Sequence, residues 1–314
     1  MINSERIFVN AIRKYCASHD IAVDIKSQGW LIVMRRGDQR RFAFGYDLGL
    51  NSAVAHRIAN DKAATADVLA ISGIPCVPHA LFLSPELYGY VKPSRAWQEM
   101  LGLLKANASG IVIKPNEGTG GDLVFRARSE PELERAVHRI FASEKSLAIS
   151  PYLEIEEEVR VILIDDQAVV VYRKERPSIV GDGKRGFLEL AVASIPASQL
   201  SVVLPVIVED LEKAALDRVL PAGERRVLNW RHNLGAGARP VVLDDSETRA
   251  ACVRVARDAA KSIGVRFGSI DVVRVDRAWR VLEINSGVMM EALGESHPDL
   301  VEAAYRIALE KLFQ

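Results

Sequence analysis

The sequence has no excess of charge of either sign, because its 41 lysine and arginine residues match its 41 aspartate and glutamate residues. Nucleic-acid-binding proteins usually carry a clustered basic excess, so this balance argues against a nucleic-acid partner. Glycine and proline occur in ordinary numbers, and no low-complexity tract is present. With 314 residues, of which 49% are hydrophobic, the chain can bury a large core, which predicts two or three globular lobes.

The sequence also lacks the marks of secretion and of membrane insertion. Its first ten residues contain no apolar signal core, and no run of about 18 apolar residues occurs. The cysteines Cys16, Cys76 and Cys252 are far apart and have no CxxC spacing, which is typical of reduced, buried thiols. No HExxH motif occurs, which disfavours a zinc hydrolase. We therefore expect a cytoplasmic protein with no membrane partner.

Helical and extended patterns alternate along the chain. Apolar spacing predicts helices over 3–18, 61–72, 131–143, 248–263 and 299–312. Extended runs predict strands over 29–35, 41–46, 110–114, 147–150, 159–164, 168–173, 269–275 and 279–284. Because most neighbouring strands are joined like hairpins, the pattern favours an α+β fold over a parallel Rossmann sheet.

The segment GSIDVVRVDRAWRVLEIN predicts a cluster of oxygen ligands. If its hairpin closes symmetrically about Arg277, Asp271 lies opposite Glu283, with their Cβ atoms about 5 Å apart. Asn285 lies two residues beyond Glu283 and so on the same face. Opposed carboxylates are unfavourable without a cation, and a hard divalent ion such as Mg²⁺ would relieve the repulsion. Exposed hairpin charges or another register would explain the pattern equally well.

A second segment, IVIKPNEGTGGD, is an apolar strand that ends in Lys114 and runs into a glycine-rich loop. Backbone N–H groups of such a loop can bind phosphates, and a lysine adds a point charge. A Walker loop places its lysine after the glycines, whereas Lys114 precedes them. On its own this pattern is more typical of a surface turn, just as Lys62 alone is more typical of a solvated helix.

Taken in order, these segments resemble the ATP-grasp superfamily from about Asn51 to the C-terminus. The resemblance is greatest to the ATP-grasp domain of cyanophycin synthetase and to glutathione-synthetase-like glutamate ligases. The motifs that carry it are DK, GIPCVPH, IVIKPNEGTGG, SPYLE, EVRVIL, RKERPSIVGDGK, WRHNLGAGA, GSIDVVRV and VLEINSG.

The resemblance implies roles for the matching positions. ATP would be bound by Lys62, Lys114, Glu117, Gly118, Gly120, Gly121, Tyr152, Leu153 and Glu158, with Tyr152 and Leu153 at the adenine hinge and Glu158 at the ribose. Two Mg²⁺ ions, with Mn²⁺ as a substitute, would be bound by Asp271, Glu283 and Asn285. The transferring phosphoryl group would lie near Arg173, Lys174, Arg231 and Asn233. Strand alternation should let only one of Arg173 and Lys174 face inward.

The resemblance also implies an architecture of two α+β lobes that clasp ATP, with a shortened N-terminal region. The expected divisions are a helix–hairpin region over 1–50 and an ATP-grasp domain over 51–314. Within that domain, residues 71–155 would form the small lobe and its hinge, and 156–314 the metal and substrate lobe. Two departures affect the site: Leu123 replaces a loop glycine, and SGVMME after Asn285 lacks the Pro-Gly of relatives.

The function implied is that of an ADP-forming carboxylate–amine ligase, which activates an acid as an acyl phosphate and joins it to an amine. Amino acids or peptides are the expected substrates, and a homodimer or homotetramer is the expected assembly. Two alternatives stay open: a phosphotransferase that uses the same nucleotide site, and a nucleotide-binding module without catalysis. An ADP-release assay with paired acids and amines would separate the three.

Overall fold

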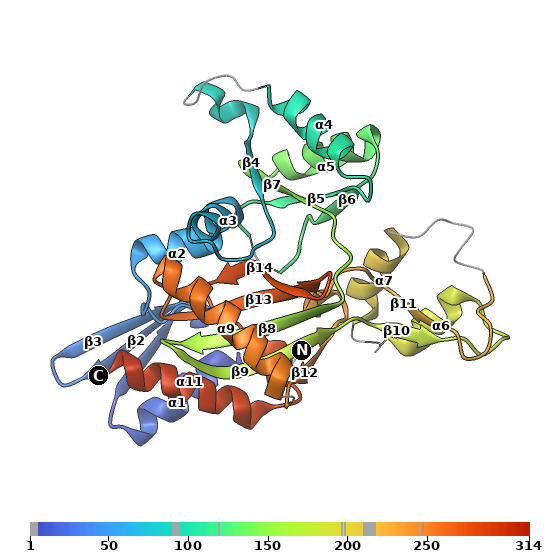
Figure 1. Cartoon of the computed structure of the whole chain (residues 1–314). Coiled ribbons are helices and arrows are strands. Elements are labelled where there is room, and N and C mark those ends of the chain that lie inside the picture. The colour runs from blue at the N-terminus through green and yellow to red at the C-terminus, as the bar shows by residue number, and fades with distance from the viewer. Residues whose placement is uncertain are drawn as a thin grey trace. The chain divides into compact units, whose positions relative to one another are not determined.

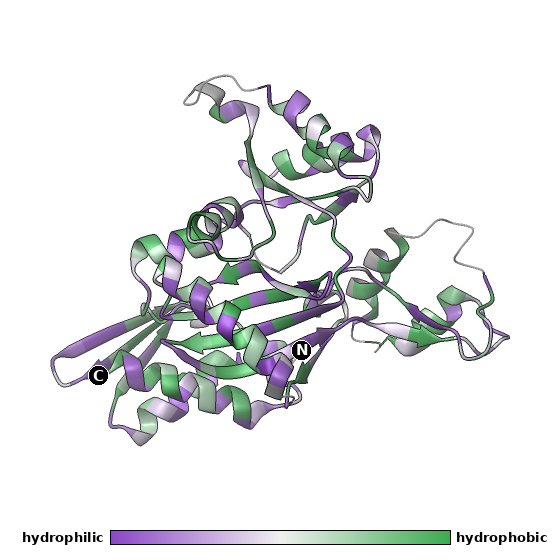
Figure 2. Cartoon of the chain, in the orientation of Figure 1, coloured by the Kyte–Doolittle hydropathy of each residue, from purple (hydrophilic) through white to green (hydrophobic). Residues whose placement is uncertain are grey.

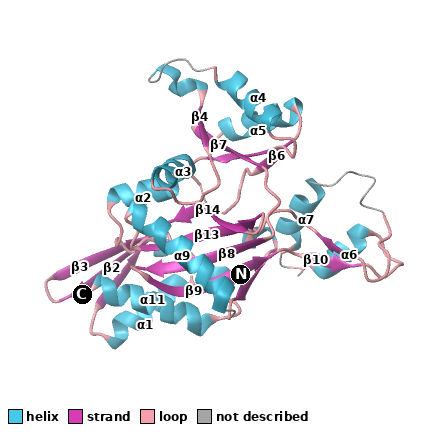
Figure 3. Ribbon diagram, in the orientation of Figure 1, coloured by secondary structure: helices cyan, strands magenta, loops and turns pink. Residues whose placement is uncertain are grey.

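A computed structural model describes residues 6–89, 95–118, 120–195, 197, 199–209, 218–244 and 246–314. Helices and strands are mixed along the chain, which confirms the predicted α+β class (Figure 3). Contacts divide the chain into unit 1, formed by Met1–Val171 with Leu243–Gln314, and unit 2, formed by Tyr172–Val242. Within the described ranges, no helix combines the length and the apolar character needed to cross a membrane.

The chain begins with helix α1 (Ile7–Ser18) and a three-stranded antiparallel sheet of β1 (Ala22–Lys26), β2 (Leu31–Arg36) and β3 (Gln39–Phe44). The predicted hairpin is therefore present, while β1 was not predicted. Residues 3–5 of the predicted first helix lie outside the described residues. In unit 1, α1 packs against the last helix, α11 (Pro298–Leu312), beside which it lies in Figure 1.

Two consecutive helices, α2 (Ala53–Asn60) and α3 (Lys62–Ile71), are separated by the single residue Asp61. The Asp61 carboxylate caps α3 by accepting a hydrogen bond from the backbone N–H of Ala64 at 2.8 Å. Such a cap satisfies one of the free N–H groups of the first turn. It fixes the start of α3, and with it the position of Lys62.

A four-stranded antiparallel sheet has the order β4-β7-β5-β6 and packs against helices α4 (Ala96–Ala106) and α5 (Glu130–Phe141). Its strands are β4 (Ala80–Leu83), β5 (Ile111–Pro115), β6 (Phe125–Ala127) and β7 (Ser146–Pro151). Its core face carries Ile111, Ile113, Leu147 and Ile149, which pack in one hydrophobic cluster. Since side chains alternate along a strand, the intervening residues of β5 and β7 point to the other face.

A five-stranded sheet has the order β12-β9-β8-β13-β14, and the boundary between the two units crosses it within β9. Its strands are β8 (Glu157–Ile164), β9 (Gln167–Glu175), β12 (Arg239–Val242), β13 (Phe267–Val275) and β14 (Ala278–Asn285). Helix α9 (Ser246–Ile263) packs on β8, β13 and β14. Hydrophilic and hydrophobic segments alternate along α9 and α11 in Figure 2, as expected for helices with one face on a core.

The β13–β14 hairpin has the predicted pairing of Asp271 with Glu283, but it reaches that pairing by a different route. Arg274, not Val275, pairs with Trp279, because the turn contains only Asp276 and Arg277, both with positive φ. A register shift between Asp271 and Val272 then places one extra residue, Leu282, in β14. This β-bulge compensates for the shorter turn. Closure about Arg277 would pair Val273 with Val281, which is wrong because Val273 pairs with Arg280, while the pairing of Asp271 with Glu283 is confirmed.

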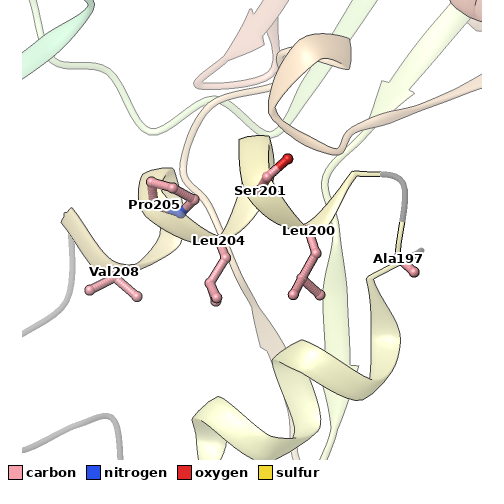
Figure 4. A pocket seen from close by; sticks show the side chains of 6 residues that line it. All are labelled: Ala197, Leu200, Ser201, Leu204, Pro205 and Val208. Carbon is pink, nitrogen blue, oxygen red and sulfur yellow. The ribbon is translucent and has the colours of Figure 1, made fainter. Parts of the chain in front are cut away.

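Unit 2 contains strands β10 (Ser178–Val180) and β11 (Arg225–Val227), and helices α6 (Phe187–Ser194) and α7 (Leu200–Glu209). Helix α7 is apolar on two sides: Val203 and Ile207 are buried in the unit's core, while Leu200, Leu204 and Val208 line an open hollow of about 520 Å³ (Figure 4). None of the predicted site residues lines this hollow.

Two of the three cysteines are buried, as predicted. Cys16 and Cys252 are fully buried, and Cys76 is half-buried. Burial raises the pKa of Cys16 to about 11 and that of Cys252 to about 12, so both thiols stay protonated near neutral pH.

Candidate functional site

The start of helix α3 is tied to the glycine-rich loop through Lys62 and Asn116. The Lys62 ammonium donates hydrogen bonds to the backbone carbonyls of Gly118 at 2.9 Å and Asn116 at 3.3 Å. The Asn116 amide oxygen accepts a hydrogen bond from the backbone N–H of Ala63 at 3.1 Å. Asn116 is almost completely buried, so it acts as a fixed link between the first turn of α3 and the loop.

The glycines of the loop adopt backbone conformations that a side chain would disfavour. Gly120 and Gly121 have φ values of 85° and 80°. Leu123, which replaces a glycine of related loops, also has a positive φ, of 54°. Its side chain packs against the core of the four-stranded sheet, which explains how a leucine is kept in this strained conformation. Thr119 lies outside the described residues.

Lys114 lies on β5, on the face of the four-stranded sheet opposite the core. Its side chain is only 7% exposed, and burial lowers its pKa to about 8, against the opposing effect of the Glu283 carboxylate. Burial also lowers the pKa of Lys62, and Glu283 again opposes the shift. Both ammonium groups therefore lie within electrostatic reach of the same carboxylate. This brings together two of the predicted phosphate-binding residues and one of the predicted metal ligands.

The three predicted metal ligands lie on the β13–β14 hairpin, with Asp271 in the middle of β13 and Glu283 and Asn285 near the end of β14. The Asn285 amide nitrogen lies 3.4 Å from Glu283 Oε1, as expected from their spacing on one face of β14. Asp271 is completely buried, and both of its carboxylate oxygens accept hydrogen bonds from Arg160 of β8, at 2.7 and 2.6 Å. This bidentate pair was not predicted, although Arg160 lies directly opposite Asp271 in the sheet.

The donor set fits a hard divalent ion in part. Carboxylate and amide oxygens suit Mg²⁺, which keeps several water or phosphate ligands of its own, so Glu283 and Asn285 fit. Asp271 fits less well, because the guanidinium of Arg160 occupies one lone pair on each of its oxygens. Across the described ranges, no three His, Cys, Asp or Glu side chains form a metal-binding group. The predicted set contains only two side chains of these types, Asp271 and Glu283, because its third member, Asn285, is an amide.

The predicted adenine hinge follows β7. The backbone N–H of Tyr152 donates to the carbonyl of Gly110 at 3.0 Å, and the guanidinium of Arg126 lies 3.2 Å from the centre of the Tyr152 ring. Leu153 packs in a small apolar cluster with Val77 and with the bulge residue Leu282. Glu158, the predicted ribose ligand, is buried on β8.

The four predicted catalytic residues belong to unit 2. Lys174 is buried and Arg173 is half-buried, so the two point to different sides of β9, as predicted. The Asn233 side chain accepts a hydrogen bond from the backbone N–H of Gly235 at 2.7 Å, and Arg231 follows Trp230 with its guanidinium near that ring. The catalytic roles of these residues stay predictions.

Three residues of unit 1 were missed by the sequence analysis: Asn116, Arg160 and the buried His79. Arg160 could have been found, because strand alternation puts it on the face of Glu158, and Asp271 needs a counter-charge. Asn116 follows Lys114 in the same motif. His79 is the last residue of the GIPCVPH motif, but the motif alone gave it no role.

No protein-family model and no curated protein matches the sequence. Solved structures do match. A bifunctional glutathione synthetase from Pasteurella multocida matches 96% of this chain with 15% sequence identity and a TM-score of 0.54. A D-alanine–D-alanine ligase from Bacillus anthracis matches 84% with 14% identity and a TM-score of 0.53. The chain covers 44% of the first protein and 68% of the second, so it spans less than half of that synthetase. At these identities the matches establish the fold, which is the ATP-grasp fold predicted from the sequence.

Proposed function

We propose that this protein is an ADP-forming carboxylate–amine ligase that acts on amino acids or peptides. The observation that carries the proposal is that the ammonium groups of the buried Lys114 and the half-buried Lys62 both lie within electrostatic reach of the Glu283 carboxylate. Two lysines removed in part or in full from water, within reach of one carboxylate, fit a triphosphate and its metal better than they fit a structural core. The shared fold with a synthetase and a ligase supports the same reading.

The proposed reaction has two steps. An oxygen of the substrate carboxylate attacks the γ-phosphorus of ATP, the bond from that phosphorus to the β–γ bridging oxygen breaks, and ADP leaves. The nitrogen of an amine then attacks the acyl carbon, phosphate leaves, and the amine loses a proton to give the amide. Phosphoryl transfer depends on positioning and charge neutralisation, so it needs no nucleophilic side chain.

The chain's own residues bind and orient the nucleotide in this proposal. Lys62 and Lys114 bind the α- and β-phosphates, and the loop of Glu117, Gly118, Gly120 and Gly121 closes over the triphosphate. Closure excludes water, which would otherwise hydrolyse an acyl phosphate. Tyr152 and Leu153 border the adenine, and Glu158 accepts hydrogen bonds from the ribose.

Glu283 and Asn285 are the proposed holders of Mg²⁺, with Asp271 as a further ligand through the lone pairs that Arg160 leaves. Two bound ions, and Mn²⁺ as a substitute, belong to the same proposal. When bound, the metal supplies neutralisation of phosphate charge, which is worth several kcal/mol in reactions of this type. Arg160 holds the neighbouring Asp271 carboxylate in place through two hydrogen bonds.

An ADP-release screen over amino acids and dipeptides, supplied as acid-plus-amine pairs with ATP and Mg²⁺, tests the proposal. We expect release of ADP and phosphate that requires both partners. A stable phosphorylated product from one partner would indicate a phosphotransferase instead. Nucleotide binding without turnover on any pair would indicate a binding module.

A further inference from the structure

A buried histidine, His79, directly precedes strand β4 of the four-stranded sheet that carries Lys114. Ala80 and Phe82 of β4 pack into the core between the sheet and its helices. Because side chains alternate along a strand, Leu81 points to the opposite side. Leu81 pairs with Ala148 of β7, and Ala148 pairs with Lys114 of β5. Paired residues point to the same face of a sheet, so Leu81 shares the face of Lys114. His79 is within electrostatic reach of Lys114.

The hydrogen bonding of His79 leaves one acceptor unused. Its Nδ1 lies 2.9 Å from the carbonyl oxygen of Val77, so Nδ1 carries the hydrogen and donates it. Nε2 then presents a lone pair, and this buried atom has no hydrogen-bond partner among the residues that the structure describes. Burial, together with the positive charge of Lys114, holds the pKa of His79 well below its ordinary value, so the ring stays neutral.

The surroundings of His79 connect it to the predicted adenine hinge. Val77, whose carbonyl oxygen binds the ring, packs in the cluster that contains Leu153 and Leu282. The backbone N–H of Val77 is itself held by the carbonyl of Val281 on β14 at 2.8 Å. On its other side, His79 is within electrostatic reach of Lys114 and Lys62. The unused acceptor thus lies in the same part of unit 1 as the hinge and the phosphate-binding lysines.

We propose that His79 selects adenine as the nucleotide base: its Nε2 accepts a hydrogen bond from the 6-amino group of adenine. ATP offers three neutral donors, the 6-amino group and two ribose hydroxyls, and the hydroxyls are assigned to the Glu158 carboxylate. In a base with a carbonyl at position 6, a lone pair of the carbonyl oxygen would face the lone pair of Nε2. The two would repel each other, and such a nucleotide would bind more weakly. This inference rests on the proposed function and adds the group that selects adenine.

Calorimetric binding without acid or amine tests the inference apart from turnover. The ligands are ATP, 2′-deoxy-ATP and purine riboside triphosphate, which differs from ATP only by lacking the 6-amino group. The proteins are the wild type, His79→Leu, His79→Gln and the control Ile149→Val, a core substitution on the opposite face of the sheet. Circular dichroism checks that each variant is folded.

We expect the wild type to bind ATP about tenfold or more tightly than purine riboside triphosphate, because a site that hydrogen-bonds a donor discriminates against its absence. His79→Leu should weaken ATP binding to the level of that analogue and leave binding of the analogue unchanged. His79→Gln should recover part of the preference, since its amide oxygen is also an acceptor. Ile149→Val should keep the full preference.

Equal binding of ATP and purine riboside triphosphate by the wild type would overturn the inference, even if no variant folds. So would a His79→Leu variant that removes the preference for ATP over 2′-deoxy-ATP and keeps the preference for the amino group. Base selection without ADP release in the acid-plus-amine screen would reject the ligase proposal and leave the role of His79 standing. ADP release with no base selection would reject the role of His79 alone.

Discussion

Lys114 on the four-stranded sheet and Asp271 on the five-stranded sheet are both almost removed from water, but their surroundings differ. Asp271 is held by two hydrogen bonds from the guanidinium of Arg160. The ammonium of Lys114 makes no ion pair or side-chain hydrogen bond with any residue in the described part of the chain, and its pKa falls to about 8.

This difference separates a charge that is compensated within the fold from one that a ligand must compensate. A buried ion pair with both partners in place costs little, whereas an unpaired buried charge destabilises the folded state. The carboxylate with the largest effect on the pKa of Lys114 is that of Glu283, which is itself a proposed metal ligand. The fold therefore keeps an ammonium group where the triphosphate is proposed to bind.

The largest effect is expected from breaking the compensated pair. Arg160→Leu leaves the Asp271 carboxylate buried without its partner, and we expect the free energy of unfolding to fall by about 3–5 kcal/mol. The double variant Arg160→Leu/Asp271→Leu should recover most of that loss, because no charge is left buried. Urea denaturation measures the stability of the single and the double variant. An Arg160→Leu variant as stable as the wild type would contradict the claim that Arg160 compensates the buried charge of Asp271.

Removing the uncompensated charge of Lys114 should raise the stability of the folded protein instead of lowering it. We expect Lys114→Met to raise the free energy of unfolding of the ligand-free protein by about 1–3 kcal/mol, since it ends the burial of an unpaired ammonium group. The same variant should lose the stabilisation that ATP gives to the wild type. Thermal unfolding with and without ATP tests both parts, and a less stable ligand-free variant would be contrary to expectation.

A smaller effect is expected from pH. The pKa of Lys114 is about 8 in the folded protein and near its ordinary value of 10.5 in the unfolded chain. The charged form is therefore disfavoured by folding below about pH 8, and stability is gained as the pH rises from about 8 towards 10.

Nucleotide affinity should change the other way. If only the charged form of Lys114 binds phosphate, affinity falls about tenfold between pH 7 and pH 9. Lys114→Arg keeps its charge over this range and should give a flatter profile in calorimetric titrations. Identical profiles for the two proteins would exclude Lys114 as the titrating group.

The fold, and the elements that carry the candidate site, could be predicted from the sequence because they depend on local patterns. The strand before Lys114 and the turn at Asp276 are both local features, and they gave the right elements. The pairing of Asp271 with Glu283 was predicted correctly from a symmetric turn, but it exists because a two-residue turn is offset by the bulge at Leu282. A bulge depends on the packing of neighbouring elements, which the sequence pattern of one hairpin does not contain.

The contacts that were missed join segments far apart in the chain. Arg160 and Asp271 are separated by 111 residues, and the pair forms only because β8 lies beside β13. The unused acceptor of His79 follows from the absence of a partner within the described part of the folded chain, which a sequence cannot reveal. Motifs and periodicity thus predict elements and single residues, whereas the compensation of buried charge emerges only from tertiary pairing.

The most direct test of the central claim is the turnover of Glu283→Ala on an active acid–amine pair with ATP and Mg²⁺. The claim is that two lysines and the ligands of the β13–β14 hairpin form one nucleotide and metal site. We expect this variant to remain folded and to lose at least about 100-fold in the rate of ADP release. The control Glu302→Ala, which removes an exposed partner of Lys14, should keep its activity. Wild-type turnover in folded Glu283→Ala would contradict the assignment of the site.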